Sequence, residues 1–214
     1  MLELKTYQKA ELSALFGTRN TQGLERKMER YGITFEKSGR GKRATYTITA
    51  IKDPFKIFCI TELDFDGGTD FHKVRNFYYY YFNDEEFMAM PDEVKEYRMK
   101  KEGSSVTRQT IATYIGKLDA KGLINRNTTN FVYYFANRQT QRRAERAEYN
   151  QAWREYWESV NSGSPSSDAI WDMRANYGGV ARKQAIPDIN GIYNEKIEYM
   201  MELIVQSIEN ELGD

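Results

Sequence analysis

Residues 104–135 read SSVTRQTIATYIGKLDAKGLINRNTTNFVYYF, a pattern that predicts a helix followed by two short strands. Apolar side chains recur at intervals of three and four residues, which places most of them on one helical face. They are Val106, Ile111, Tyr114, Ile115 and Leu118. The opposite face carries polar and cationic groups, namely Arg108, Gln109, Thr110 and Lys117. We expect Gly122 to end the helix and Leu123-Ile124 to begin a β-hairpin.

A similar order of elements is predicted near the N-terminus. Two short helices and then two alternating strands are expected at residues 7–16, 23–31, 33–37 and 44–50. Between the helices lies a polar turn, residues 18–22. Between the strands lies Ser38-Gly39-Arg40-Gly41-Lys42-Arg43. Its glycines and cations predict a flexible hairpin tip suited to lie along phosphates.

Both patterns resemble winged helix-turn-helix units, a superfamily dominated by DNA-binding proteins. Two such units in tandem are similar to bacterial transcription regulators and to plasmid and phage replication initiators. The resemblance implies an α+β fold that is mainly α. It places winged helices at residues 1–52 and 53–136, followed by a helical C-terminal region at residues 137–214.

The resemblance also implies which side chains contact DNA. The first recognition helix would present Thr18, Arg19, Asn20, Gln22, Arg26, Lys27 and Arg30, and the first wing Arg40, Lys42 and Arg43. Arg and Lys can donate to guanine, and Asn and Gln can pair with adenine. The second helix would present Thr107, Arg108, Gln109, Thr110 and Tyr114. The second wing turn, residues 126–130, holds one cation, so this unit either contacts DNA weakly or serves mainly in assembly.

Cations are unevenly distributed along the chain, although its net charge is zero. Residues 1–52 hold 11 Lys and Arg against 5 Asp and Glu. The corresponding numbers are 11 and 13 for residues 53–136, and 9 and 13 for residues 137–214. This distribution favours a local phosphate-binding surface on the first unit. The alternative is that these cations only solvate the surface.

Most of the remaining chain is also predicted to be helical. Residues 55–63, FKIFCITEL, are interpreted as a strand. Helices are expected at residues 71–82, 91–103, 138–160 and 192–212, a linker at 162–168, and a loop-rich segment at 176–191. Four consecutive helical residues point in all directions. We therefore expect one or two of Tyr78–Tyr81 in the core and the others exposed or at an interface.

The C-terminal region supplies two apolar stripes, which suggest a homodimer through residues 137–214. The first comprises Tyr149, Trp153, Tyr156, Trp157 and Val160. The second comprises Tyr193, Ile197, Met200, Ile204, Ile208 and Leu212. Pairing between chains would align two DNA-reading units on a two-fold axis. The alternative is that the stripes pack on each other and on the second unit within one chain.

Motifs for catalysis or cofactor binding were not found. The loop at residues 64–72 holds alternating carboxylates, but a turn that caps the next helix explains them better than a metal site. His72 is the only histidine, and no phosphate loop or serine nucleophile motif occurs. No apolar run reaches the ~20 residues of a membrane span. The single cysteine, Cys59, is expected to be a buried thiol in a cytoplasmic protein.

The leading hypothesis is a sequence-specific binder of double-stranded DNA without enzymatic activity or cofactor. It would be a transcriptional regulator, or a replication or maintenance factor of a bacterial mobile element or phage. The alternative is a winged-helix adaptor that binds proteins, such as an inhibitor of a nucleic-acid-handling enzyme.

Overall fold

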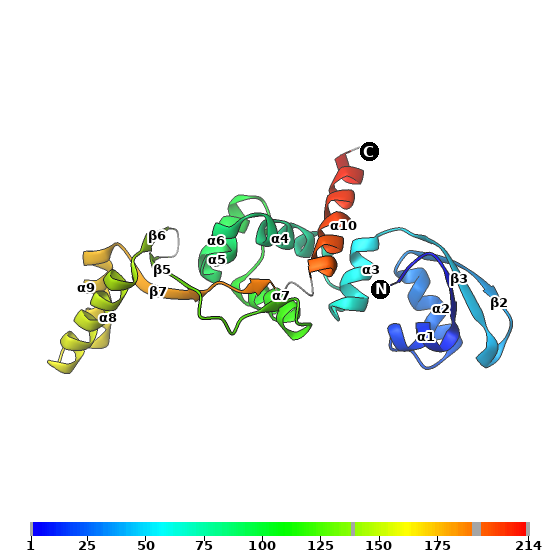
Figure 1. Cartoon of the computed structure of the whole chain (residues 1–214), viewed down its shortest axis with the longest axis horizontal. Helices are drawn as coiled ribbons and strands as arrows, with labels where there is room; N and C mark the ends of the chain where they lie inside the picture. Colours follow the sequence, from blue (N-terminus) through cyan, green and yellow to red (C-terminus); the bar gives the residue numbers. More distant parts are fainter. Residues whose placement is uncertain (1, 138–139, 190–193, 213–214) are drawn as a thin grey trace. The chain divides into compact units, whose positions relative to one another are not determined.

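The computed structural model describes residues 2–137, 140–189 and 194–212. The fold is α+β and mainly α, as predicted. The chain forms two compact units (Figure 1). Unit 1 comprises Met1–Phe71 and Glu195–Asp214, and unit 2 comprises His72–Asn194. The C-terminal helix therefore belongs with the N-terminal elements.

Unit 1 begins with two helices and a three-stranded antiparallel sheet. Its elements, in chain order, are β1 (Thr6–Gln8), α1 (Lys9–Leu15), α2 (Thr21–Arg30), β2 (Ile33–Ser38), the 3-10 turn η1 (Gly41–Arg43) and β3 (Thr45–Ile51). The strand order is β1-β3-β2, so β2 and β3 form the expected hairpin and β1 adds a strand on its other side. This pairing confirms the two strands that the alternating pattern predicts at residues 33–37 and 44–50.

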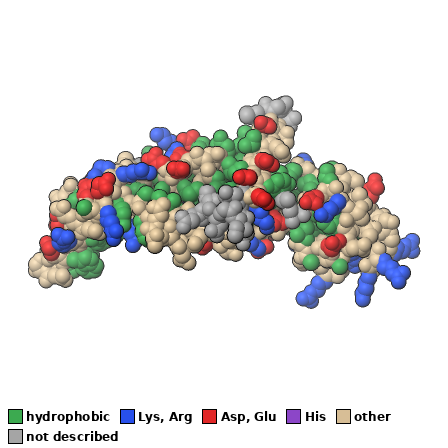
Figure 2. Space-filling model, in the orientation of Figure 1, with side chains coloured by type: hydrophobic (Ala, Val, Ile, Leu, Met, Phe, Trp, Pro, Cys, Tyr) green, Lys and Arg blue, Asp and Glu red, His purple; other side chains and the backbone are tan. Residues whose placement is uncertain are grey.

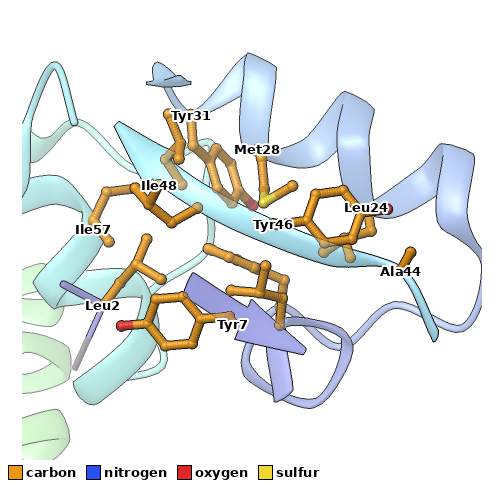
Figure 3. Packing of buried hydrophobic residues seen from close by; sticks show 12 residues of the cluster. Leu2, Tyr7, Leu24, Met28, Tyr31, Ala44, Tyr46, Ile48 and Ile57 are labelled. Atoms are coloured by element: carbon orange, nitrogen blue, oxygen red, sulfur yellow. The ribbon is translucent and has the colours of Figure 1, made fainter. Parts of the chain in front are cut away.

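The core of unit 1 lies between α2, the sheet and the helix that follows it (Figure 3). Leu24 and Met28 project from α2 onto Tyr46 and Ile48 of β3, and all four side chains are buried. Their spacing on α2 is the helical period that the sequence shows. The core thus fixes which face of α2 is turned inward and which remains at the surface.

Residues 55–62 are helical, so the strand interpretation of residues 55–63 was wrong. They lie in α3 (Pro54–Glu62). The Asp53 carboxylate accepts a hydrogen bond from the Lys56 backbone amide at 2.8 Å, and Pro54 occupies the first turn. An Asp N-cap followed by Pro favours the start of a helix. A short apolar run by itself cannot distinguish a strand from a buried helix.

The C-terminal helix α10 (Asn194–Leu212) confirms the helix predicted there and packs within unit 1. Its Tyr199 ring lies 6.0 Å from that of Phe58 on α3, and the Lys196 ammonium lies 2.9 Å from the Glu62 carboxylate. Ile197, Met200, Leu203 and Ile204 are buried. Three members of the second apolar stripe, Ile197, Met200 and Ile204, are therefore covered within one chain. Tyr193, which was assigned to that stripe, lies outside the described residues.

Unit 2 begins with four helices, which are α4 (Phe71–Asn83), α5 (Glu85–Ala89), α6 (Asp92–Lys101) and α7 (Arg108–Ala120). The helix expected in residues 104–135 is thus confirmed, and the five apolar side chains assigned to its inner face are buried. Of the tyrosine run, Tyr78 and Tyr81 are buried, whereas Tyr79 is 38% exposed. Two rings lie in the core, as expected from helical geometry.

The two strands after α7 do not pair with each other, which corrects the expected second hairpin. β4 (Ile124–Asn125) pairs with β8 (Asp188–Ile189). β5 (Phe131–Ala136) lies between β6 (Gln141–Ala144) and β7 (Val180–Ala185) in a three-stranded antiparallel sheet. Long-range pairing with residues 180–189 has replaced the local turn. The second wing is absent from the described residues.

A helical hairpin packs on this sheet and corrects three further expectations. α8 (Arg146–Asn161) is shorter than the predicted helix, because residues 141–144 form β6 instead. The predicted linker shrinks to four residues, since α9 (Ser166–Tyr177) begins within it. β7 and β8 occupy the segment that was expected to be loop-rich.

The first apolar stripe is only partly covered by these elements. Tyr149, Trp153 and Tyr156 pack beside the buried side chains Phe135 and Met173. Trp157 of α8 and Trp171 of α9 remain 55% and 64% exposed. In Figure 2, hydrophobic side chains reach the surface at the end of unit 2 that α8 and α9 form in Figure 1. No helix among the described residues is long and apolar enough to cross a membrane.

Candidate nucleic-acid interface

The turn before α2 is held by side chains that had been expected to read bases. The Asn20 side-chain oxygen accepts a hydrogen bond from the Gly23 amide at 2.5 Å and caps α2. The Thr18 hydroxyl is buried and has no hydrogen-bond partner. The Asn20 oxygen is thus engaged as a helix cap, and burial keeps the Thr18 hydroxyl away from a base edge.

Lys27 also serves the fold. Its ammonium donates to the Phe16 carbonyl at 2.7 Å and lies 5.9 Å from the centre of the Tyr31 ring. This contact ties the middle of α2 to the C-terminal end of α1. A half-buried lysine in such a position is restrained, so its expected role in DNA contact does not fit the structure.

The remaining residues assigned to the first recognition helix are free and exposed. Gln22, Arg26 and Arg30 lie on the outer face of α2, and Arg19 precedes the helix. None of the three arginines forms an ion pair with another described residue. They therefore remain available to donate to phosphates or base edges.

The turn between β2 and β3 presents the second group of cations. Arg40, Lys42 and Arg43 are exposed and make no ion pair within the described part of the chain. Gly39 and Gly41 adopt φ of 76° and 63°, the left-handed region that glycine favours. These angles fold the tip into η1 while the next residue, Ala44, is buried. Figure 2 shows Lys and Arg side chains projecting from this end of unit 1.

One carboxylate of α2 is neutralised locally. Glu25 accepts from the Tyr46 hydroxyl at 2.8 Å and lies 2.8 Å from the Lys37 ammonium. The hydrogen bond from Lys37 lowers the pKa of Glu25, while burial and the Glu25 carboxylate raise the pKa of Tyr46 to about 12. Glu25 was not identified from the sequence, because its partners Lys37 and Tyr46 lie on strands β2 and β3 and are distant in sequence. The cluster fastens α2 to the hairpin and pairs the carboxylate that precedes Arg26 in the sequence with Lys37.

The second predicted recognition helix is less suited to DNA. The Thr107 hydroxyl caps α7 by accepting from the Thr110 amide at 3.3 Å, and the two hydroxyls lie 2.9 Å apart. Tyr114 is 5% exposed and packs against Phe77 and Tyr78. A buried ring cannot reach a base edge, so this residue does not fit its expected role.

Arg108 faces carboxylates at the start of α7. Its guanidinium lies 3.5 Å from the Glu93 carboxylate, and its backbone amide donates to Glu96 at 3.1 Å. Arg182 approaches Glu93 at 3.5 Å as well. In this group, Gln109 alone is exposed and makes no side-chain contact with another described residue. Acidic neighbours repel phosphates, so the start of α7 is a poor phosphate site.

Other candidate chemistry is limited. Cys59 is buried in α3, which confirms the expected burial, and burial raises the pKa of its thiol. In the loop at residues 64–72, Asp66 accepts from the Thr69 amide through its backbone carbonyl at 3.0 Å. Among the described residues, no group of three or more His, Cys, Asp or Glu could hold a metal ion.

Comparison with known proteins assigns no family. No protein-family model, curated protein or solved structure matches the chain. The geometry of the two units is therefore the basis for any functional assignment.

Proposed function

We propose that residues 1–52 form a winged helix-turn-helix and that the protein binds double-stranded DNA through it. The support is the element order of unit 1, with two helices followed by an antiparallel hairpin and a third strand beside β3. In this arrangement α2 enters the major groove and the β2–β3 turn lies on the flanking backbone.

The observation that carries the proposal is the set of exposed, uncommitted cations on these two elements. They are Arg19, Arg26, Arg30, Arg40, Lys42 and Arg43. Two lysines of the same helix and hairpin are engaged instead, Lys27 with the Phe16 carbonyl and Lys37 with Glu25. A surface that leaves these cations unpaired while fixing its neighbours is suited to bind a polyanion.

The test concerns base reading by α2. A preferred duplex would first be selected from a random-sequence pool with the full chain. Gln22→Ala and Arg26→Ala should then each reduce the binding free energy by about 1–3 kcal/mol on that duplex and by much less on unrelated DNA. Arg154→Ala, an exposed arginine of α8, is the matched control. Equal losses on both duplexes would limit these side chains to phosphate contact, and no saturable duplex binding would refute the proposal.

The second candidate function is contact with a protein, either a different partner or a second copy. The exposed rings of Trp157 and Trp171 on the α8–α9 hairpin favour it, because apolar side chains that are exposed together often mark interaction surfaces. Sedimentation of the full chain with Trp157→Ser and Trp171→Ser as variants tests the homodimer. If the full chain sediments as a monomer at tens of micromolar, both free and on DNA, the homodimer is excluded.

A further inference from the structure

A pocket in unit 2, with a volume of about 390 Å³, brings together polar groups from separate helices. Tyr81 of α4, Lys95 of α6 and Arg126 of the turn after β4 line it. Asp92 and Asp119 lie on its wall as well. We call it the Lys95 pocket. Its volume falls in the range of ligand sites, roughly 300–1,000 Å³.

Lys95 places a buried ammonium group in the wall of this pocket. Its side chain is 1% exposed, and its Nζ donates to the Met90 carbonyl at 2.5 Å. The Asp92 carboxylate is 3.7 Å away, beyond hydrogen-bond distance. Burial lowers the pKa of Lys95 to about 8, although Asp92 opposes this change. An ammonium has three donors, so Lys95 retains hydrogen-bonding capacity.

Tyr81 adds a second buried donor. The residue is 1% exposed, and its hydroxyl makes no hydrogen bond with any described residue. The hydroxyl is not among the fully buried atoms that lack a partner, so it reaches the pocket that Tyr81 lines. Burial raises the pKa of Tyr81, so the hydroxyl keeps its proton at neutral pH. The pocket is the space into which this hydroxyl can donate.

Arg126 supplies the third donor group. It is exposed, lines the same pocket and forms no ion pair in the described part of the chain. Its charge is close enough to Lys95 to help lower the pKa of that residue. Folding has thus brought two cations together in a pocket whose wall also carries the carboxylates of Asp92 and Asp119.

We propose that the Lys95 pocket binds a small organic anion through a carboxylate or phosphate group. The hydrogen-bonding capacity left unused by Tyr81, Lys95 and Arg126 consists of donors, which an anionic oxygen can accept. An anion would also relieve the repulsion between the two cations. A purely structural role for Lys95 explains its bond to Met90, but it leaves the Tyr81 hydroxyl and Arg126 without partners. The site lies in unit 2 and does not depend on DNA binding by unit 1.

The probes are inorganic phosphate and acetate, each titrated into the full chain at constant ionic strength with chloride as the replaced ion. The nitrogen NMR signal of Lys95 Nζ, assigned with Lys95→Arg, reports occupancy. We expect a saturable shift with at least one probe and a higher pKa of Lys95 at saturation. Tighter binding of phosphate would indicate a phosphorylated ligand, and tighter binding of acetate a carboxylate.

Two variants keep the proposal falsifiable even if replacement of Lys95 unfolds the protein. Tyr81→Phe keeps the ring and removes only the hydroxyl, and Arg126→Gln removes only the charge. Each variant should lower the affinity for the probe about tenfold, whereas Arg146→Gln on the exposed face of α8 should leave it unchanged. The proposal is overturned if neither probe gives a saturable shift, or if both variants bind with the wild-type affinity.

Discussion

Replacing Arg40, Lys42 and Arg43 together by alanine should weaken duplex binding on every sequence and make it less sensitive to salt. The three side chains are exposed and form no ion pair with a described residue, so the change removes charge without breaking a contact. The free energy of unfolding should change by less than about 0.5 kcal/mol for each replacement, as for most surface substitutions.

The magnitude follows from the number of available cations. The logarithm of the binding constant falls with the logarithm of salt concentration by about 0.9 for each phosphate neutralised. Six exposed cations are available on α2, the turn before it and the β2–β3 turn: these three and Arg19, Arg26 and Arg30. If all of them contact phosphates, the slope of log binding constant against log salt is about −5, and removal of the three in the β2–β3 turn leaves about −3. Arg19, Arg26 and Arg30 would supply the remainder. The triple variant should therefore retain roughly half of the salt dependence.

Fluorescence anisotropy of a labelled duplex, measured from about 50 to about 300 mM KCl, gives both slopes. The control is Arg143→Ala, Arg146→Ala and Arg154→Ala combined, which removes the same charge from exposed positions in unit 2. A triple variant of the β2–β3 turn with the wild-type slope would refute the role of this turn. A control that loses as much would show that only the net charge matters.

Two further outcomes test the packing. In Gly67→Ala the new Cβ would come 2.5 Å from the Tyr31 ring, so urea unfolding should show a loss of about 1–3 kcal/mol. Gly68→Ala, where nothing lies within 4 Å, should be nearly neutral, and equal losses would contradict the close approach. Lys95 has a folded-state pKa of about 8 against 10.5 in the unfolded chain. Because the unfolded state holds the extra proton in that window, the wild type should gain up to about 3 kcal/mol over Lys95→Met as pH rises through it. A constant difference between the two proteins would show that the pKa of Lys95 is not lowered.

Local signals predicted the elements whose partners are close in sequence. α7 follows the three-and-four spacing of its apolar residues, and the β2–β3 hairpin follows its alternating strands. α3 could have been recognised from Asp53-Pro54, which caps its first turn. That signal was outweighed by an apolar run that suits a buried strand equally well.

Pairing between distant segments was beyond local patterns. Residues 126–130 suggest a hairpin turn, yet the Asn127 amide donates to the Asn125 side chain and the Asn130 amide to the Thr128 hydroxyl, each at 2.9 Å. These bonds stabilise turns without requiring that β4 and β5 meet. β5 instead pairs with β7, and no local feature of the sequence around β5 predicts that pairing.

The candidate interface was predicted in composition but not in detail. In the sequence, Arg26 and Lys27 are equivalent neighbouring cations on one helix, and only the fold shows that their roles differ. Lys27 reaches the Phe16 carbonyl, whereas Arg26 remains free. Asn20 shows the same limit, because a residue type that reads adenine is also a preferred helix cap.

The return of α10 to unit 1 makes that unit discontinuous in the chain. The polypeptide leaves it after Phe71 and re-enters at Glu195. During synthesis, the side chains that contact α10, such as Phe58, can be covered only after residues 195–212 have been synthesised. Docking of α10 also closes a loop that contains all of unit 2. The entropic cost of this closure grows by about 0.6 kcal/mol for each doubling of the flexible length. Unfolding unit 2 would lengthen that loop and so weaken unit 1 at a distance, without any change in the contacts of unit 1 itself.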